Sequence, residues 1–107
     1  APHKVRINNG GNNIDFIIKD KNGNVYFTAD ASTSRVGIGT ETPSTELHIG
    51  GALTWNEKSS DPSDPAEGQS VLWMSDGTGT GDDGDILMKI TAGGVTKTVT
   101  LVDFSAS

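Results

Sequence analysis

The sequence predicts an all-β fold built from short antiparallel hairpins and sheets. Period-2 stretches of β-branched and aromatic residues recur along the chain, and glycine-rich turns separate them. No segment sustains the 3.6-residue spacing of an amphipathic helix. Fourteen of the 107 residues are glycines, which favours short strands and frequent turns.

The first predicted hairpin joins residues 14–18 to residues 25–29. Asn22 and Gly23 lie between them and predict a type I′ turn, because both residue types tolerate positive φ. This turn sets two opposed pairs, Ile18 with Phe27 and Phe16 with Ala29. A slip of one residue would move every apolar side chain to the other face, so the pairing is well specified.

The second predicted hairpin joins residues 85–92 to residues 95–102 through Gly93 and Gly94. A two-residue turn predicts three opposed pairs, Ile90 with Lys97, Met88 with Val99, and Ile86 with Leu101. The apolar side chains then share one face of the hairpin, and threonines dominate the other.

Two apolar side chains, Leu87 and Val102, fall on the polar face of this second hairpin. Residues 70–74 or a neighbouring chain would have to cover them. Trp73 lies within that apolar stretch, so we expect it in the core. A sheet this small is thin by itself, which indicates packing between chains.

Three parts follow one another along the chain. Residues 1–54 are predicted to form a shaft-like β segment, and residues 70–107 a C-terminal hairpin domain at the tip. Residues 55–69 are polar and contain two Asp-Pro pairs, which predicts a linker or a loop that crosses between chains.

The apolar content predicts an obligate oligomer. Ile, Leu, Val and Phe make up about a fifth of the residues, close to the content below which chains stay disordered. A lone chain of this size buries only part of its surface. We therefore expect copies of the chain to complete its core.

Charge and residue usage exclude several classes of protein. The formal net charge of −6 argues against nucleic-acid binding, because phosphate affinity needs a basic face. The absence of cysteine excludes disulfides and thiolate chemistry. No apolar run is long enough to span a membrane, so we expect no membrane insertion.

Residues 35–49 resemble a repeat of fibrous virion proteins. They read RVGIGTETPSTELHI and are similar to the VGIGT-x-x-P-x-x-x-LH-(I/V) repeat of bacteriophage fibre proteins and some bacterial surface proteins. Residues 14–33 look like the unit that precedes this repeat in such fibres. Residues 65–79 and 81–90 are similar to the C-terminal end of many phage structural proteins. The resemblance implies a parallel, intertwined homotrimer with prism-like or β-helix-like form.

The resemblance also implies a function. The chain would be a trimerising C-terminal segment of a phage fibre, located in the virion, that presents a host-attachment tip. Its partners would be copies of itself, other virion proteins and a host cell-surface glycan or protein. Two alternatives stay open: a tip that itself binds the glycan, and a module of a phage or bacterial surface fibre that only sets the register of the trimer.

The predicted trimer core consists of apolar residues from the strands. Its members are Phe16, Ile18, Val36, Ile38, Leu47, Ile49, Ile86, Met88, Ile90, Val99 and Leu101.

Gly37 and Gly39 alternate with Val36 and Ile38, so one face of this strand carries no side chains. Such a strand allows another backbone to approach closely near a symmetry axis. An irregular turn is the alternative interpretation of the two glycines. Pro43 is expected to end the strand.

The sequence contains no catalytic constellation, so we expect no enzyme. His48 lies between Leu47 and Ile49 and should point away from the face that they share. Neither the nucleophile elbow of hydrolases nor a P-loop occurs.

Asp76, Asp82, Asp83 and Asp85 cluster in a glycine-rich loop. Oxygen ligands of this kind suit a hard cation such as Ca²⁺, although the spacing is not that of an EF-hand. The alternative is a solvated loop in which Asp and Gly set the turns, with no cofactor.

Trp55 and Tyr26 are the candidates for stacking against a glycan. Trp55 precedes the polar segment, and Tyr26 falls on the polar face of the first hairpin. Aromatic rings at such positions offer an apolar surface with a polar edge.

Overall fold

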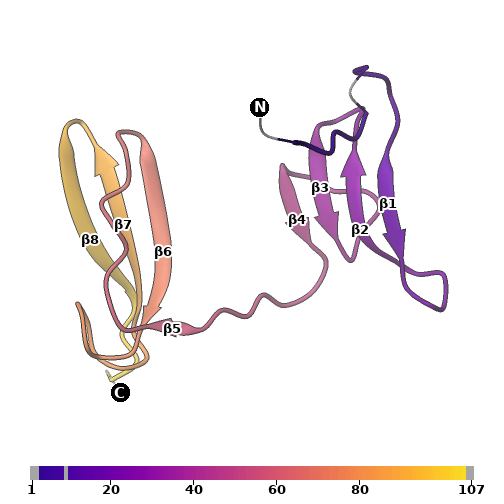
Figure 1. Ribbon diagram of the computed structural model, residues 1–107. Coiled ribbons are helices and arrows are strands. Elements are labelled where there is room, and N and C mark those ends of the chain that lie inside the picture. Colours follow the sequence, from indigo (N-terminus) through magenta and orange to yellow (C-terminus); the bar gives the residue numbers. More distant parts are fainter. Residues whose placement is uncertain (1–2, 9, 106–107) are drawn as a thin grey trace. The chain divides into compact units, whose positions relative to one another are not determined.

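The computed structural model describes residues 3–8 and 10–105, which form strands and no helix (Figure 1). The prediction of an all-β chain is therefore confirmed. Two compact units divide the chain, residues 1–53 and residues 54–107, and each contains a four-stranded mixed sheet. No helix long and apolar enough to cross a membrane occurs in the described ranges.

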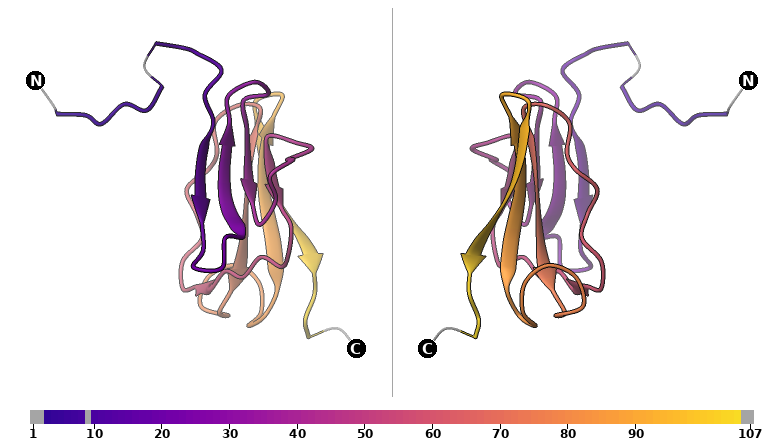
Figure 2. Two further views of the ribbon diagram at one scale, coloured as in Figure 1. Left: turned by 90° about the vertical axis from the view of Figure 1, so that its right-hand side faces the viewer. Right: turned by 90° about the vertical axis from the view of Figure 1, so that its left-hand side faces the viewer.

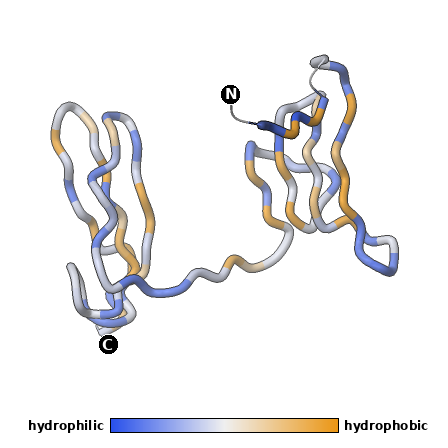
Figure 3. Tube along the Cα trace, in the orientation of Figure 1, coloured by the Kyte–Doolittle hydropathy of each residue, from blue (hydrophilic) through white to orange (hydrophobic). Residues whose placement is uncertain are grey.

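The first unit holds the sheet β1-β2-β3-β4. Its strands are β1 (Phe16–Lys19), β2 (Val25–Asp30), β3 (Arg35–Ile38) and β4 (Leu47–Ile49). The first three strands pair antiparallel, whereas β3 and β4 run parallel. Figure 3 shows hydrophobic residues along these strands and hydrophilic residues in the turn between β1 and β2.

The predicted register of the first hairpin is confirmed, but the predicted turn is wrong. Phe16 pairs with Ala29 and Ile18 with Phe27. The Asp20 carbonyl accepts the N–H of Gly23, and only Gly23 takes a positive φ, of 84°. A bulge in β2, at Tyr26, takes up the extra residue.

The Asp20 side chain explains why the turn differs. Its carboxylate Oδ1 accepts the N–H groups of Asn22 at 2.8 Å and Asn24 at 2.9 Å. These backbone hydrogen bonds, that from Asn24 above all, lower the pKa of Asp20. A carboxylate that captures two amides favours this longer turn over a two-residue one.

Residues 39–46 connect the parallel strands β3 and β4 and lie over one face of the sheet. Gly37 is buried there, and a Cβ atom on it would overlap the Thr40 carbonyl oxygen. The expected close approach near a symmetry axis is therefore wrong for Gly37, because the backbone that approaches it belongs to its own chain. The prediction that Pro43 ends the strand is also wrong, since β3 stops at Ile38.

Further contacts hold this connecting loop in place. Pro43 is buried, and its carbonyl accepts a hydrogen bond from Arg35 at 3.2 Å. The Ser44 N–H donates to Nδ1 of His48 at 3.1 Å. His48 thus lies on the loop side of the sheet, on the opposite face from its neighbours in β4.

The second unit holds the sheet β5-β6-β7-β8. Its strands are β5 (Glu57–Lys58), β6 (Gln69–Ser75), β7 (Ile86–Ala92) and β8 (Val95–Val102). β5 runs parallel to β6, and the other pairs are antiparallel. Residues 55–69, expected as a linker or crossing loop, thus include a short strand of this sheet.

The second hairpin has the predicted turn. Gly93 and Gly94 have φ values of 60° and 77°, as a type I′ turn requires. The Glu67 carboxylate accepts both of their N–H groups, at 2.9 and 2.7 Å.

Two of the three predicted pairs in this hairpin are confirmed, Ile90 with Lys97 and Met88 with Val99. The third is wrong, because Ile86 pairs with Val102 and Leu101 occupies a bulge. Figure 2 shows the C-terminal end of β8 diverging from β7, where this bulge lies. The bulge moves Val102 from the expected polar face to the face of Ile86.

The core of the second unit lies on the face that was expected to be polar. Trp73 and Leu87 pair across β6 and β7 and are only 3% and 1% exposed. The core position of Trp73 is confirmed. A Cβ atom on Gly81 would lie 3.1 Å from Leu87, so the loop that precedes β7 covers this leucine.

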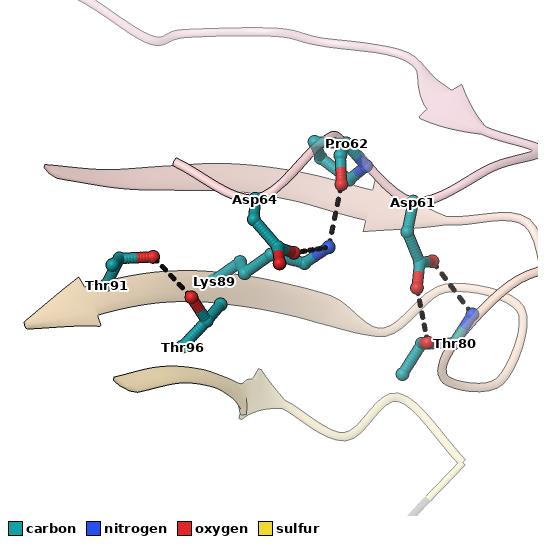
Figure 4. A network of polar contacts seen from close by, with 7 residues as sticks. All are labelled: Asp61, Pro62, Asp64, Thr80, Lys89, Thr91 and Thr96. Atoms are coloured by element: carbon teal, nitrogen blue, oxygen red, sulfur yellow. Dashed lines mark hydrogen bonds and ion pairs between the residues drawn. The ribbon is translucent and has the colours of Figure 1, made fainter. Parts of the chain in front are cut away.

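Residues 59–66 lie over another part of that face, beside Lys89, and are held there by polar contacts (Figure 4). The Lys89 ammonium donates to the Pro62 carbonyl at 2.7 Å and lies 3.1 Å from the Asp64 carboxylate. The Asp61 carboxylate accepts hydrogen bonds from the hydroxyl and the N–H of Thr80. These bonds, the one from the hydroxyl foremost, lower the pKa of Asp61.

Candidate functional site: the open faces of the two sheets

The first sheet has one face that its own chain leaves uncovered. We call the face opposite the 39–46 loop the first open face. Strand pairing places two rows of residues on it, Phe16-Ala29-Val36-Leu47 and Ile18-Phe27-Ile38-Ile49. All eight side chains are apolar, and three of them are exposed: Leu47 at 60%, Ile38 at 40% and Phe16 at 39%. A continuous apolar surface of this kind marks an interaction site.

A groove of about 370 Å³ lies over β1, β2 and β3 on this face. Phe16, Phe27 and Val36 line it from the sheet, and Ile7 and Ile14 line it from the segment before β1. The rings of Phe16 and Phe27 meet edge to face with centroids 6.0 Å apart, which fixes the shape of the groove.

The second sheet also has one uncovered apolar face, opposite Trp73 and Leu87. We call it the second open face. Its paired rows are Leu72-Met88-Val99, Ser70-Ile90-Lys97 and Met74-Ile86-Val102. A groove of about 270 Å³ lies here, lined by Ile90, Ala92, Val95, Lys97 and Val99.

The structure brings the predicted trimer-core residues together within each unit. The six in the first unit all lie on the first open face, and four of the five in the second unit lie on the second open face. Leu101 is the exception, because the bulge removes it from the pairing. Ile14 and Val95 also belong to these surfaces, on the apolar faces that alternation predicts for the two hairpins. Ile7 and Leu72 were missed, since a pairing scheme gives no sign of what lies beside a hairpin.

Each unit buries little on its own. Among the described residues, the buried large hydrophobic side chains are Trp73 and Leu87, both in the second unit. Hydrophobic burial is the main favourable term in folding, and it must offset the conformational entropy of an ordered chain. The two open faces are thus the surface whose burial would stabilise the units most.

The predicted cation ligands do not form one cluster. Asp82 and Asp85 lie with Asp103, with one carboxylate oxygen of each within 4.8 Å of the others. Asp85 is 4% exposed, and its two oxygens accept the N–H groups of Asp82 at 3.0 Å and Phe104 at 2.9 Å. Because backbone amides already engage both oxygens, Asp85 serves to fold the loop.

Asp76 and Asp83 lie outside that group. Asp76 accepts the N–H of Thr78 at 2.8 Å, which is a local turn contact. Asp83 faces Glu57 of β5. Asp103 was missed as a neighbour of these acids, because only the pairing of β7 with β8 brings it near them.

A pH dependence follows from the contact between Glu57 and Asp83. The hydrogen bond with Asp83, and then its negative charge, raise the pKa of Glu57. The folded chain therefore holds this proton more tightly than the unfolded chain. The resulting stability is fully present below the ordinary glutamate pKa and is lost as the pH rises through the raised pKa.

Glu57→Gln should therefore remove one component of the pH dependence of stability. We expect the unfolding temperature of the wild type, relative to that of Glu57→Gln, to fall as the pH rises above about 4.3. Thermal unfolding at a series of pH values measures this difference. Glu41→Gln, in the first unit, is the matched control for the change in net charge. Parallel curves for wild type and Glu57→Gln would contradict the prediction.

The two aromatic candidates for glycan stacking belong to different units. Tyr26 lies on β2 and is 50% exposed, on the face opposite Phe27. Trp55 lies before β5 and is partly exposed. Neither side chain lines the two grooves described above.

No protein-family model matches the chain, and no match is found among curated proteins or solved structures.

Proposed function

We propose that the chain is a structural, self-associating module of a fibre, in which three copies pack their open faces around a common axis. One observation carries this proposal: in each unit the chain's own loops lie over part of one face of the sheet, and the other face is apolar and exposed. Copies of the same chain are always available to one another as partners. In a ring with rotational symmetry, every copy uses its contact surfaces fully.

The number three and the phage virion are supported by the resemblance of residues 35–49 to the fibre repeat. The features of this repeat have separate roles in the fold. Gly37 and Pro43 fit the loop that covers one face of the sheet, whereas Leu47 and Ile49 remain on the open face. Such a sequence would recur wherever a loop must lie over one face of a sheet and the other face must stay apolar and exposed.

The function would be mechanical and presentational, with no catalysis. Packing of three open faces would give a rigid, protease-resistant segment near the end of a fibre. Threefold repetition would also raise the avidity of any host contact that the segment presents.

A pair of neighbouring substitutions in β8 tests this proposal. Val99 lies on the second open face, and Thr98 points to the other side of the same strand. Val99→Asp should dissociate the trimer, because assembly would bury an unpaired carboxylate. Thr98→Asp adds the same charge and should leave the trimer intact.

Analytical ultracentrifugation of the two variants and the wild type distinguishes the outcomes. We expect the sedimentation of a monomer for Val99→Asp and of a trimer for the other two proteins. Trimers of equal stability in both variants would show that the second open face takes no part in the assembly.

A further inference from the structure

We propose that the first unit assembles head to tail, with Leu47 of one copy inserted into the groove beside Phe16 of the next copy. This inference rests on the proposed self-association and specifies the contact that produces it. The occupant of the groove is thus a second copy of this chain.

The strand register places the two contact partners at the same height. Phe16 and Leu47 are the two ends of one row that crosses the sheet from β1 to β4. When identical sheets are related by rotation about an axis parallel to their strands, residues at equal height meet. Leu47 of one copy can therefore reach the groove of the next copy without either copy moving along the axis relative to the other.

The two ends of this row have complementary shapes. The groove is lined from β1, β2 and β3, and β4 takes no part in it. Leu47 projects from β4, the strand at the other edge of the sheet, and is 60% exposed. A side chain that projects from β4 and a groove over the other three strands form a heterologous contact, which a ring of copies closes.

The two sides of the sheet also differ in charge. Residues 3–35 carry five lysines and arginines and three acidic side chains, whereas residues 36–53 carry two acidic side chains, Glu41 and Glu46, and neither lysine nor arginine. A head-to-tail contact brings the basic side against the acidic side.

Cross-linking tests the contact directly, because the chain has no native cysteine. The test protein carries Ile14→Cys and Leu47→Cys, which place one thiol at the groove and one on the projecting edge. Both residues are exposed, at 59% and 60%, so the substitutions should not disturb the fold. A short bis-maleimide should yield covalent dimers and trimers, and no larger species.

The matched control protein carries Tyr26→Cys with Leu47→Cys. Tyr26 is 50% exposed but does not line the groove, so this pair should yield no ladder. Leu47→Cys alone should also stay uncross-linked, because a two-fold contact would be needed to join two copies of it.

A second comparison does not depend on cross-linking. Leu47 and Leu53 are equally exposed, at 60% and 61%, but only Leu47 belongs to the row. Leu47→Glu should raise the concentration at which the trimer half-dissociates by at least about tenfold, and Leu53→Glu by less than about twofold.

The possible results separate this contact from the proposed function. A trimer that cross-links through the control pair or through Leu47→Cys alone would overturn the head-to-tail contact and leave self-association standing. Equal effects of Leu47→Glu and Leu53→Glu would also overturn it. A wild-type chain that is monomeric throughout would overturn both.

Discussion

Gly37→Ala should lower the free energy of unfolding of the first unit by about 3 kcal/mol. A Cβ atom at this position would overlap the backbone oxygen of Thr40 and lie 2.9 Å from the Thr40 Cγ2 atom. Backbone cannot turn aside as a flexible side chain can, so the 39–46 loop would have to lift from the sheet. The loss should be largest in β3 and β4, which that loop joins.

Hydrogen exchange measures this effect at individual amides. The Val36 N–H, which donates to the Glu46 carbonyl at 2.8 Å, should lose most of its protection in Gly37→Ala. Gly51→Ala is the matched control, since no atom lies within 4 Å of a Cβ at Gly51. Unchanged protection at Val36 in Gly37→Ala would show that the loop does not close this face.

Leu87→Ala should destabilise the second unit by about 4 kcal/mol. Leu87 is 1% exposed, pairs with Trp73 and lies beneath Gly81. Truncation would leave a cavity between the sheet and the loop that precedes β7. Because this unit has so few buried apolar side chains, neighbouring residues have little with which to fill the cavity.

Denaturant unfolding followed by tryptophan fluorescence measures this loss, because both tryptophans lie in the second unit. Leu53→Ala removes an equally large side chain that is 61% exposed, and it should cost well under 1 kcal/mol. Similar losses for the two variants would show that the core of the second unit lies elsewhere.

The strand pairs of both hairpins could be predicted because alternation and turn residues agree there. Gly93 and Gly94 both adopt the positive φ that a two-residue turn needs, so the register near them follows directly. The first turn differs from the predicted one because the Asp20 carboxylate accepts two backbone N–H groups. Turn propensities of single residues do not include this interaction. The β8 bulge likewise has no clear sign in the run of apolar residues around Leu101.

Which face of the second sheet is buried could not be predicted. Alternation separates Leu87 from Ile86 and Met88, but it does not show which set a loop will cover. Contacts of Gly81 and Pro62 decide this, and both lie in glycine- or proline-containing segments without periodic pattern. The larger apolar set, which includes Ile86 and Met88, therefore lies on the open face.

The parallel pairs β3–β4 and β5–β6 were also missed. Parallel strands normally need a long crossover, often a helix, whereas the 39–46 loop is short. The apolar pattern did place the members of each open face together. It gave no sign of the groove, because Ile7 reaches it from outside the predicted strands.

The mass of the purified chain in solution, measured by light scattering, tests the central claim most directly. Two sheets with uncovered apolar faces should hold three copies together. We predict a single species of about three times the chain mass of 11.1 kDa, unchanged on dilution into the micromolar range. A well-folded species of 11.1 kDa at every concentration would contradict the account.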